Sequence, residues 1–283
     1  MEASNVTIGR VEPVVIRPPS RWTGIGAAEL WRFRELLFFF AWRDLKVRYK
    51  QTFLGVTWAV LQPVMYMVVF TLFFGRIANL YSEGKPYALL ALSGAVIWLF
   101  FANAVALSAG SLVGNASLIT KIYFPRLLAP LAPVIAGLVD LALSFAVLLA
   151  VMAAYGEYPA PGRIWVVIPF LVLAMVTAAG VGSWLAALNV KYRDVRYVVP
   201  FMLQLWLFAS PVVYSSELLQ GRLETLYYLN PMAGVVEGFR WATLGGIPPS
   251  YGSVGLSALA AGVMLILGVL YFRRTERTFA DIV

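Results

Sequence analysis

Six long apolar stretches occupy most of this chain. They are Leu54–Arg76, Tyr87–Leu107, Leu127–Tyr155, Ile164–Leu188, Val198–Tyr214 and Leu256–Phe272. An α-helix rises about 1.5 Å per residue, so about 20 residues cross a hydrocarbon core about 30 Å thick. Backbone groups in lipid must satisfy their own hydrogen bonds, so each stretch is expected to be a helix. The pattern predicts an all-α polytopic membrane protein with six transmembrane helices, of which Val198–Tyr214 is the shortest.

The composition supports this class, because 61% of the residues are hydrophobic and 13% are charged. No polar stretch is long enough to build an independent soluble core. Histidine and cysteine are both absent, which excludes metal sites built on those ligands, and no metal is expected. We expect a single domain over residues 51–283.

Basic residues indicate the orientation of the helices. With the N-terminus in the cytoplasm, the inner segments hold 17 of the 22 lysines and arginines. The opposite topology would violate the positive-inside rule in every short loop. The N- and C-termini are therefore expected in the cytoplasm, and the net charge of +8 is attributed to topology and anionic lipid rather than to nucleic acid.

The region before the first stretch divides into two parts. Residues 1–27 are polar and contain prolines, which predicts a flexible cytoplasmic arm. Residues 28–50 are predicted to form an amphipathic interface helix, too short in its apolar run to span the membrane. On that helix Phe38, Trp42, Leu45 and Tyr49 share one face, and Arg43, Lys46 and Lys50 lie about 100° away. The alternative is a helix packed against the bundle.

Two connecting segments are unusually apolar. The inner loop Ser111–Arg126 contains Leu118–Ile119 and Ile122–Tyr123–Phe124, which either form an exposed docking element or tuck under the bundle. The outer segment of about 215–250 is predicted to hold two half-length helices, which is typical of a re-entrant hairpin. Within it, Glu237 and Arg240 are three residues apart and are able to pair on one helix face.

The sequence offers little chemistry of its own. It has no G-x-x-x-x-G-K-[ST] phosphate loop, so any ATP must be bound by a partner subunit. Asp140 is the one ionisable residue deep within a predicted span, and no lysine or arginine is expected at its depth. We interpret it as a protonated or water-linked carboxyl inside the bundle, with a proton relay as the less favoured alternative.

Aromatic residues gather on the first and fifth stretches. Tyr66, Phe70, Phe73 and Phe74 follow an i, i+4, i+7, i+8 pattern that places them in one stripe. Such a stripe faces lipid or core more often than ligand. Its functional interpretation is a surface on which sugar rings stack without being trapped by a fixed polar group.

Four segments together resemble the permease subunit of polysaccharide ABC exporters, the family that moves O-antigen, capsule or teichoic acid chains. They are RDLKVRYKQTFLGVTWAVLQP (Arg43–Pro63), LITKIYFPRLLAP (Leu118–Pro130), LNVKYRDVRYVVPFMLQLWLFASPVVY (Leu188–Tyr214) and LNPMAGVVEGFRWATLG (Leu229–Gly245). The resemblance covers nearly everything from Leu36 to Arg274, and the N-terminal arm lies outside it.

This resemblance implies a homodimer in the inner membrane, two copies of a cytoplasmic ABC ATPase subunit that bind ATP and Mg, and a lipid-linked polysaccharide substrate. It implies no enzymatic activity and no cofactor in this chain. The residues expected to couple to the ATPase are Ser117, Leu118, Ile119, Lys121, Ile122, Tyr123 and Phe124. The candidates for the channel lining are Trp58, Tyr66, Phe70, Phe73, Phe74, Phe201, Gln204, Trp206 and Phe208.

The same resemblance assigns the two mouths of the channel. Arg43, Lys46, Arg48 and Lys50 are candidates to receive a lipid phosphate, although ordinary positive-inside anchoring also explains them. Asn230, Pro231, Glu237 and Arg240 are candidates for an outer gate. Three other functions remain open: export of a drug or small lipid, ion-coupled transport through Asp140, and transferase chemistry, for which clustered acids are lacking.

Overall fold

The computed structural model describes residues 27–50, 55–77, 85–119, 121, 124–214, 222–276 and 279. The arm predicted for residues 1–27 lies outside this part of the chain except for Ala27, which begins the first helix. Ile122 and Tyr123 also lie outside the described residues, as does the segment 215–221. Every regular element among the described residues is helical, as predicted.

The chain begins with two short helices and a first long one: α1 (Ala27–Arg32), α2 (Arg34–Lys50) and α3 (Gly55–Phe70). A π-helical turn, Thr71–Ile77, extends α3. The following elements are α4 (Tyr87–Gly114), α5 (Ala116–Ile119), α6 (Leu128–Ala154), the 3₁₀ turn Ile164–Val166, α7 (Val167–Lys191), α8 (Val195–Phe208), α9 (Arg222–Tyr227), α10 (Pro231–Leu244) and α11 (Tyr251–Thr275).

Five helical segments among the described residues are long and apolar enough to cross a membrane. They are Gly55–Gly75, Tyr87–Gly114, Leu128–Ala154, Ile164–Lys191 and Tyr251–Thr275. The sixth predicted span, Val198–Tyr214, corresponds to α8, which has 14 residues and a length of about 21 Å. The six-span count is therefore not confirmed, because α8 ends at Phe208, before the predicted stretch does.

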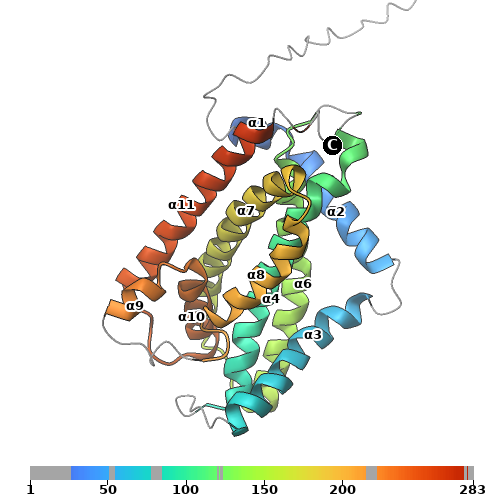
Figure 1. The fold of residues 1–283 in the computed structure, drawn as a ribbon. Coiled ribbons are helices and arrows are strands. Elements are labelled where there is room, and N and C mark those ends of the chain that lie inside the picture. The colour runs from blue at the N-terminus through green and yellow to red at the C-terminus, as the bar shows by residue number, and fades with distance from the viewer. Residues whose placement is uncertain are drawn as a thin grey trace, which may run out of the picture.

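Helix α4 forms the centre of the bundle, as Figure 1 shows. In its most apolar 18-residue stretch, 89% of the residues are buried. The helix is hydrophobic on every side and packs against α3, α6, α7, α8 and α10. In the corresponding stretch of the segment Gly55–Gly75, only 6% of the residues are buried. One long apolar helix is thus enclosed by protein, and another has few fully buried residues.

The packing of α7 on α11 depends on two glycines. A Cβ atom added to Gly268 would lie 2.1 Å from the carbonyl oxygen of Gly180, and one added to Gly180 would lie 2.6 Å from the amide nitrogen of Leu265. Both distances are far below van der Waals contact, so only glycine permits this backbone approach. In lipid, where no hydrophobic force draws helices together, such close packing is a main source of helix association.

A second apolar cluster joins the two ends of the chain to the bundle. The rings of Phe40 of α2 and Phe124 pack edge to face with their centroids 5.2 Å apart. The rings of Phe272 of α11 and Phe279 pack in the same way, with their centroids 5.4 Å apart. All four side chains are buried in one cluster with Leu128 of α6. Helix α2 therefore packs on α6 through one face, as the alternative of a bundle contact predicted.

The opposite face of α2 remains exposed. Phe38 and Trp42, predicted to face the acyl boundary, are exposed together with Phe39 and Val47. Tyr49, predicted for the same face, instead turns toward the bundle and donates a hydrogen bond to Asp140 of α6. The predicted face is thus split, because the helix buries Phe40 and Ala41 rather than the stripe expected from the spacing.

A proline shapes α3. Pro63 lies inside this helix and has no N–H, so the carbonyl of Ala59, four residues earlier, loses its usual intrahelical partner. The hydroxyl of Ser144 on α6 donates a hydrogen bond of 3.2 Å to that carbonyl. The side chain of a neighbouring helix thus satisfies a backbone group in apolar surroundings, which is how membrane helices tolerate proline.

Candidate functional site

Asp140 has a cationic partner, which corrects the expectation drawn from its depth in the sequence. Arg48 of α2 forms an ion pair with its carboxylate, and the Tyr49 hydroxyl donates a hydrogen bond to its other oxygen. Burial, followed by the hydrogen bond to Asp140, raises the pKa of the Tyr49 phenol above its ordinary value. The end of α2 reaches the third long stretch because α2 packs along α6, a contact that sequence spacing does not reveal.

The four candidate phosphate ligands fall into different environments. Arg48 is engaged by Asp140, and Arg43 pairs with Asp44 at 2.8 Å while its guanidinium lies 5.2 Å from the centre of the Phe40 ring. Lys46 and Lys50 are exposed. A shallow groove of about 290 Å³ runs along this face of α2, lined by Phe39, Trp42, Arg43, Lys46, Val47 and Lys50. Its aromatic and basic lining suits an amphipathic anion.

The predicted coupling loop contains a short helix, α5. Ser117 and Lys121 are exposed, and Leu118 is half-buried. Phe124 is only 5% exposed, so this residue follows the alternative in which the loop tucks under the bundle. Asn115 closes α4, because its side-chain amide donates to the carbonyl of Ser111 at 2.7 Å.

The aromatic stripe of α3 divides into buried and exposed residues. Phe70 is 9% exposed, and its ring centroid lies 5.3 Å from that of Tyr66 and 6.1 Å from that of Phe74. Phe70 therefore belongs to the core rather than to a channel wall. Phe73, in contrast, is exposed, as is Trp58 near the start of the helix. The π-helical turn begins at Thr71, between Phe70 and Phe73, and changes the helical register on which the predicted stripe depended.

Helix α8 presents one exposed face. Phe201, Gln204 and Phe208 lie on it at helical spacing. Trp206 lies on another face, where its ring contacts Phe101 of α4 at 5.1 Å and its indole N–H donates to the Asn230 side chain at 2.8 Å. Of the α8 residues predicted to line a channel, Trp206 thus packs against α4 and binds Asn230, whereas the other three lie on the exposed face.

Asn230 joins α8 to α10. Its side-chain oxygen caps α10 by accepting from the amide of Met232 at 3.0 Å, and Pro231 occupies the first turn of that helix. Its side-chain nitrogen donates to the carbonyl of Ala209 at 3.0 Å and to the Ser210 hydroxyl at 2.9 Å. One side chain thus fixes the start of α10 against the end of α8.

Arg240 holds the same turn from the other half of α10. Its guanidinium donates to the carbonyls of Pro211 at 2.6 Å, Val212 at 3.3 Å and Tyr214 at 3.3 Å. Glu237, the expected partner of Arg240, is buried and accepts a hydrogen bond from the Tyr228 hydroxyl. The two residues therefore anchor different parts of the 209–229 region onto α10, a role that spacing within one helix does not predict.

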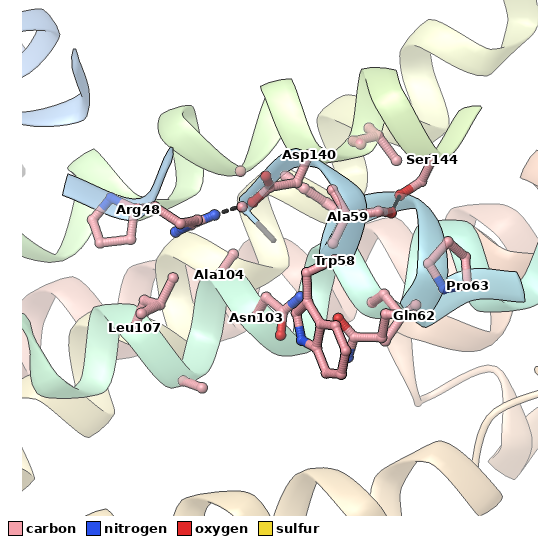
Figure 2. A pocket seen from close by; sticks show the side chains of 17 residues that line it. Arg48, Trp58, Ala59, Gln62, Pro63, Asn103, Ala104, Leu107, Asp140 and Ser144 are labelled. Atoms are coloured by element: carbon pink, nitrogen blue, oxygen red, sulfur yellow. Dashed lines mark hydrogen bonds and ion pairs between the residues drawn. The ribbon is translucent and has the colours of Figure 1, made fainter. Parts of the chain in front are cut away.

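A pocket of about 600 Å³ lies between α3, α4 and α6, and Figure 2 shows its lining. The Arg48–Asp140 pair stands at one end, and Ser144 and Pro63 stand at the other. Trp58 and Gln62 of α3 and Asn103 of α4 line it as well. Gln62 and Asn103 were missed in the sequence, because single amides in apolar helices give no pattern until the helices are placed side by side.

The arrangement is that of a polytopic membrane protein: a helical bundle with exposed aromatic faces, a buried α10 and five helical segments long and apolar enough to cross a membrane. Comparison with known proteins agrees. Residues 35–244 match the family described as "ABC-2 type transporter", and the chain belongs to that family of membrane permeases. The chain is accordingly a transport permease and not an enzyme.

Three relatives illustrate the relationship. The O-antigen export system permease protein RfbA of Myxococcus xanthus is 31% identical over 75% of this chain and 81% of its own length. A protein of the same name from Klebsiella pneumoniae is 24% identical over 85% of this chain and 92% of its own. The polysialic acid transport protein KpsM of Escherichia coli is 23% identical over 83% and 91%. The resemblance to permeases of polysaccharide ABC exporters is thereby confirmed.

Proposed function

We propose that this protein is the channel-forming permease of an ABC transporter that exports a lipid-linked polysaccharide across the inner membrane. Two copies of the chain enclose the path, and ATP hydrolysis in separate cytoplasmic subunits drives the movement. The observation that carries the proposal is the uncovered apolar surface of α3 and α8 in a chain whose relatives are named for O-antigen and polysialic acid export.

The exposed residues on α3 and α8 suit a path for sugar. Trp58, Phe73, Phe201 and Phe208 offer aromatic faces, on which the C–H groups of a pyranose ring stack. A single chain cannot enclose a path with one open surface, so a second copy is needed to close it. Gln204 lies on the same face of α8 and supplies a polar group between the rings.

The end of the bundle that carries α1 and the C-terminal end of α11 is assigned to the cytoplasm by the positive-inside rule. There, the exposed part of the coupling loop, Ser117 and Lys121, is positioned to meet the ATPase. Phe124 anchors that loop to Phe40 of α2. A push on the loop therefore reaches α2 and α6, both of which contact α3 of the proposed path.

The groove on α2 is the proposed entry for the lipid carrier. Lys46 and Lys50 are exposed and Arg43 is half-exposed, so they are available to a phosphate at the membrane interface. Phe39 and Trp42 beside them suit the start of the lipid chain. Arg48 is removed from this set, because it neutralises Asp140.

At the opposite end, α9 and α10 are the proposed outer re-entrant helices. Helix α10 has 14 residues, too few to span, and is almost entirely buried against α4, α7 and α11. Asn230 and Arg240 bind its two halves to the segment that follows α8. Movement of α8 is thereby linked to the outer end of the path.

The decisive experiment uses cells whose own polysaccharide permease is deleted and whose matching ATPase and glycosyltransferases remain. Expression of this chain should restore the glycan at the cell surface, and an ATPase variant unable to hydrolyse ATP should abolish it. Glycan that stays inside cells containing correctly assembled complex would contradict the proposal. So would vectorial glycan transport by this chain reconstituted alone.

Two alternatives make different predictions. If the complex exports a drug or small lipid, its ATPase activity should rise with those compounds and not with the lipid-linked glycan. An ion-coupled transporter would need Asp140 to exchange protons, whereas the structure pairs it with Arg48. A carboxylate held in an ion pair with Arg48 and in a hydrogen bond with Tyr49 has a structural role, which weighs against a relay.

A further inference from the structure

We propose that the pocket between α3, α4 and α6 is a binding site for one uncharged sugar unit, built from Trp58, Gln62 and Asn103. This inference rests on the proposed export of a glycan and locates one subsite within it. The pocket has a volume of about 600 Å³, within the range of about 300–1,000 Å³ typical of small-molecule sites.

The two amides are the first reason. Gln62 and Asn103 are half-buried, and no hydrogen bond of either side chain is found within the part of the chain that the structure describes. Each amide offers two donors and an oxygen that accepts. Because both side chains are only half-buried, their amides are accessible from the pocket. A ligand with neighbouring hydroxyl groups supplies both donors and acceptors to them.

The indole of Trp58 is the second reason. It is 57% exposed and lines the same pocket as the two amides, so its ring is accessible to a ligand. Figure 2 shows the three side chains gathered in the space between α3 and α4. A pyranose ring matches this combination, since its C–H face packs on an aromatic ring while its hydroxyl edge meets polar groups.

The neutral end wall is the third reason. Arg48 and Asp140 both line the pocket, but they neutralise each other. A pocket with one unpaired charge would select a charged ligand, whereas this pocket presents none from that pair. We therefore assign the site to an uncharged sugar and not to a sialic acid or a glycosyl phosphate.

The pocket is also held open by structure outside the amides. The hydrogen bond from Ser144 to the Ala59 carbonyl fixes α3 against α6 beside Pro63. Gly137 adds to the space, because a Cβ atom at this position would lie 3.2 Å from the Phe100 ring, on the pocket wall. A preformed site binds more tightly than one that must be ordered on binding.

The test measures sugar binding to the complete complex of this chain with its ATPase in lipid nanodiscs, since maltoside detergents would themselves compete. The probes are methyl glycosides of glucose, galactose, mannose, rhamnose and N-acetylglucosamine, observed by saturation-transfer NMR. Methyl sialoside and glucose 1-phosphate serve as charged probes. At least one neutral probe should bind, and the charged probes should not.

Variants locate the binding. Gln62→Met and Asn103→Leu keep the side-chain size, remove the amide and should weaken binding at least tenfold. Trp58→Leu should do the same, and its matched control is Trp165→Leu, at an exposed tryptophan of the 3₁₀ turn before α7. Ala106→Phe, which fills the pocket without altering either amide, is a second route to the same loss if an amide variant fails to fold.

Export of the native glycan is measured in parallel, so that the two proposals fail separately. Equal sugar binding in wild type and all pocket variants would overturn the subsite, even where export is normal. Stronger binding of the charged probes, or no binding of any neutral probe, would overturn it as well. Loss of glycan export by the wild-type complex would instead overturn the proposed function.

Discussion

Arg48 near the end of α2 and Asp140 within α6 form an ion pair, although 92 residues separate them in the sequence. The pair fastens the helix that precedes the first span to the third long span. Its two side chains are 28% and 17% exposed, so it is neither a surface pair nor fully enclosed. It also explains how a carboxylate lies so deep in an apolar helix.

Removal of either charge should weaken this attachment. Breaking a fully buried pair costs about 3–5 kcal/mol, and partial exposure lowers the expected loss for Arg48→Met to about 1–3 kcal/mol. Asp140→Asn keeps an oxygen that accepts from Tyr49 and should cost less, with export preserved. Thermal unfolding in nanodiscs and surface glycan measure the two effects.

The control for that pair is the double variant Arg48→Met/Asp140→Asn. If the two charges interact, its melting temperature should exceed the value expected from adding the single losses. Abolished export by a correctly assembled Asp140→Asn dimer would contradict the structural role and favour a relay.

A charge placed in the coupling loop should separate ATP hydrolysis from export. Ile122→Asp and Tyr123→Asp put a carboxylate into the apolar part of that loop, where desolvation at a subunit contact is unfavourable. ATPase activity should persist while surface glycan falls at least tenfold. Tyr158→Asp, at an exposed site beyond the end of α6, is the control and should leave both unchanged. Normal transport by the loop variants would exclude a docking role.

The glycine contact between α7 and α11 should be intolerant of a methyl group. Gly268→Ala places a Cβ atom 2.1 Å from the Gly180 carbonyl oxygen and should destabilise the protein by about 1–3 kcal/mol. Gly262→Ala in the same helix meets nothing within 4 Å and should be neutral. The melting temperatures of the two variants decide the matter, and equal values would show that the helices separate easily.

Arg240 should be difficult to replace, because its fork reaches three backbone carbonyls. Arg240→Lys keeps the charge but not the planar set of guanidinium donors, so it should recover only part of the stability lost in Arg240→Met. Faster amide hydrogen exchange in residues 209–214 is the expected signature. Arg193→Met, at an exposed arginine after α7, should leave that exchange unchanged. If amide hydrogen exchange in residues 209–214 is unchanged in Arg240→Met, Arg240 does not stabilise this turn.

Glu276 should make stability depend on pH. Burial raises the pKa of its carboxyl, although Arg126 and Arg273 oppose the change and Glu29 adds to it. The folded state binds the proton more tightly than the unfolded state. The free energy of unfolding therefore falls as pH rises from the unfolded-state pKa of about 4.3 through the raised folded-state pKa. Glu276→Gln should therefore gain stability relative to wild type as pH increases from 4 to 7. A constant difference across that range would contradict the assigned cause.

The sequence predicted the elements whose signal is local. Hydropathy identified the long helices, because a span needs only length and apolar composition. A half-length helix predicted for the outer segment is found as α10, where Asn230 caps the helix and Pro231 occupies its first turn, interactions that act within a few residues. The four family segments lie largely within the region that matches the ABC-2 type transporter family, residues 35–244.

Contacts between helices were not predictable in the same way. Helical spacing placed Phe70 in one stripe with Tyr66 and Phe74 but left open whether that stripe faces lipid, core or channel, and the structure shows Phe70 buried. Tyr49 was assigned to the lipid face, yet it binds Asp140. In both cases periodicity shows which residues share a face and not what that face meets.

By itself, the sequence determined that this protein lies in a membrane, which segments are helical, and to which family it belongs. Only the tertiary structure decided that Asp140 has a cation, that Phe124 is buried, and that Gln62 and Asn103 share a pocket. The physical reason is range. Hydrophobicity and capping act within one helix, whereas ion pairs, ring contacts and cavities depend on how separate helices are placed against one another.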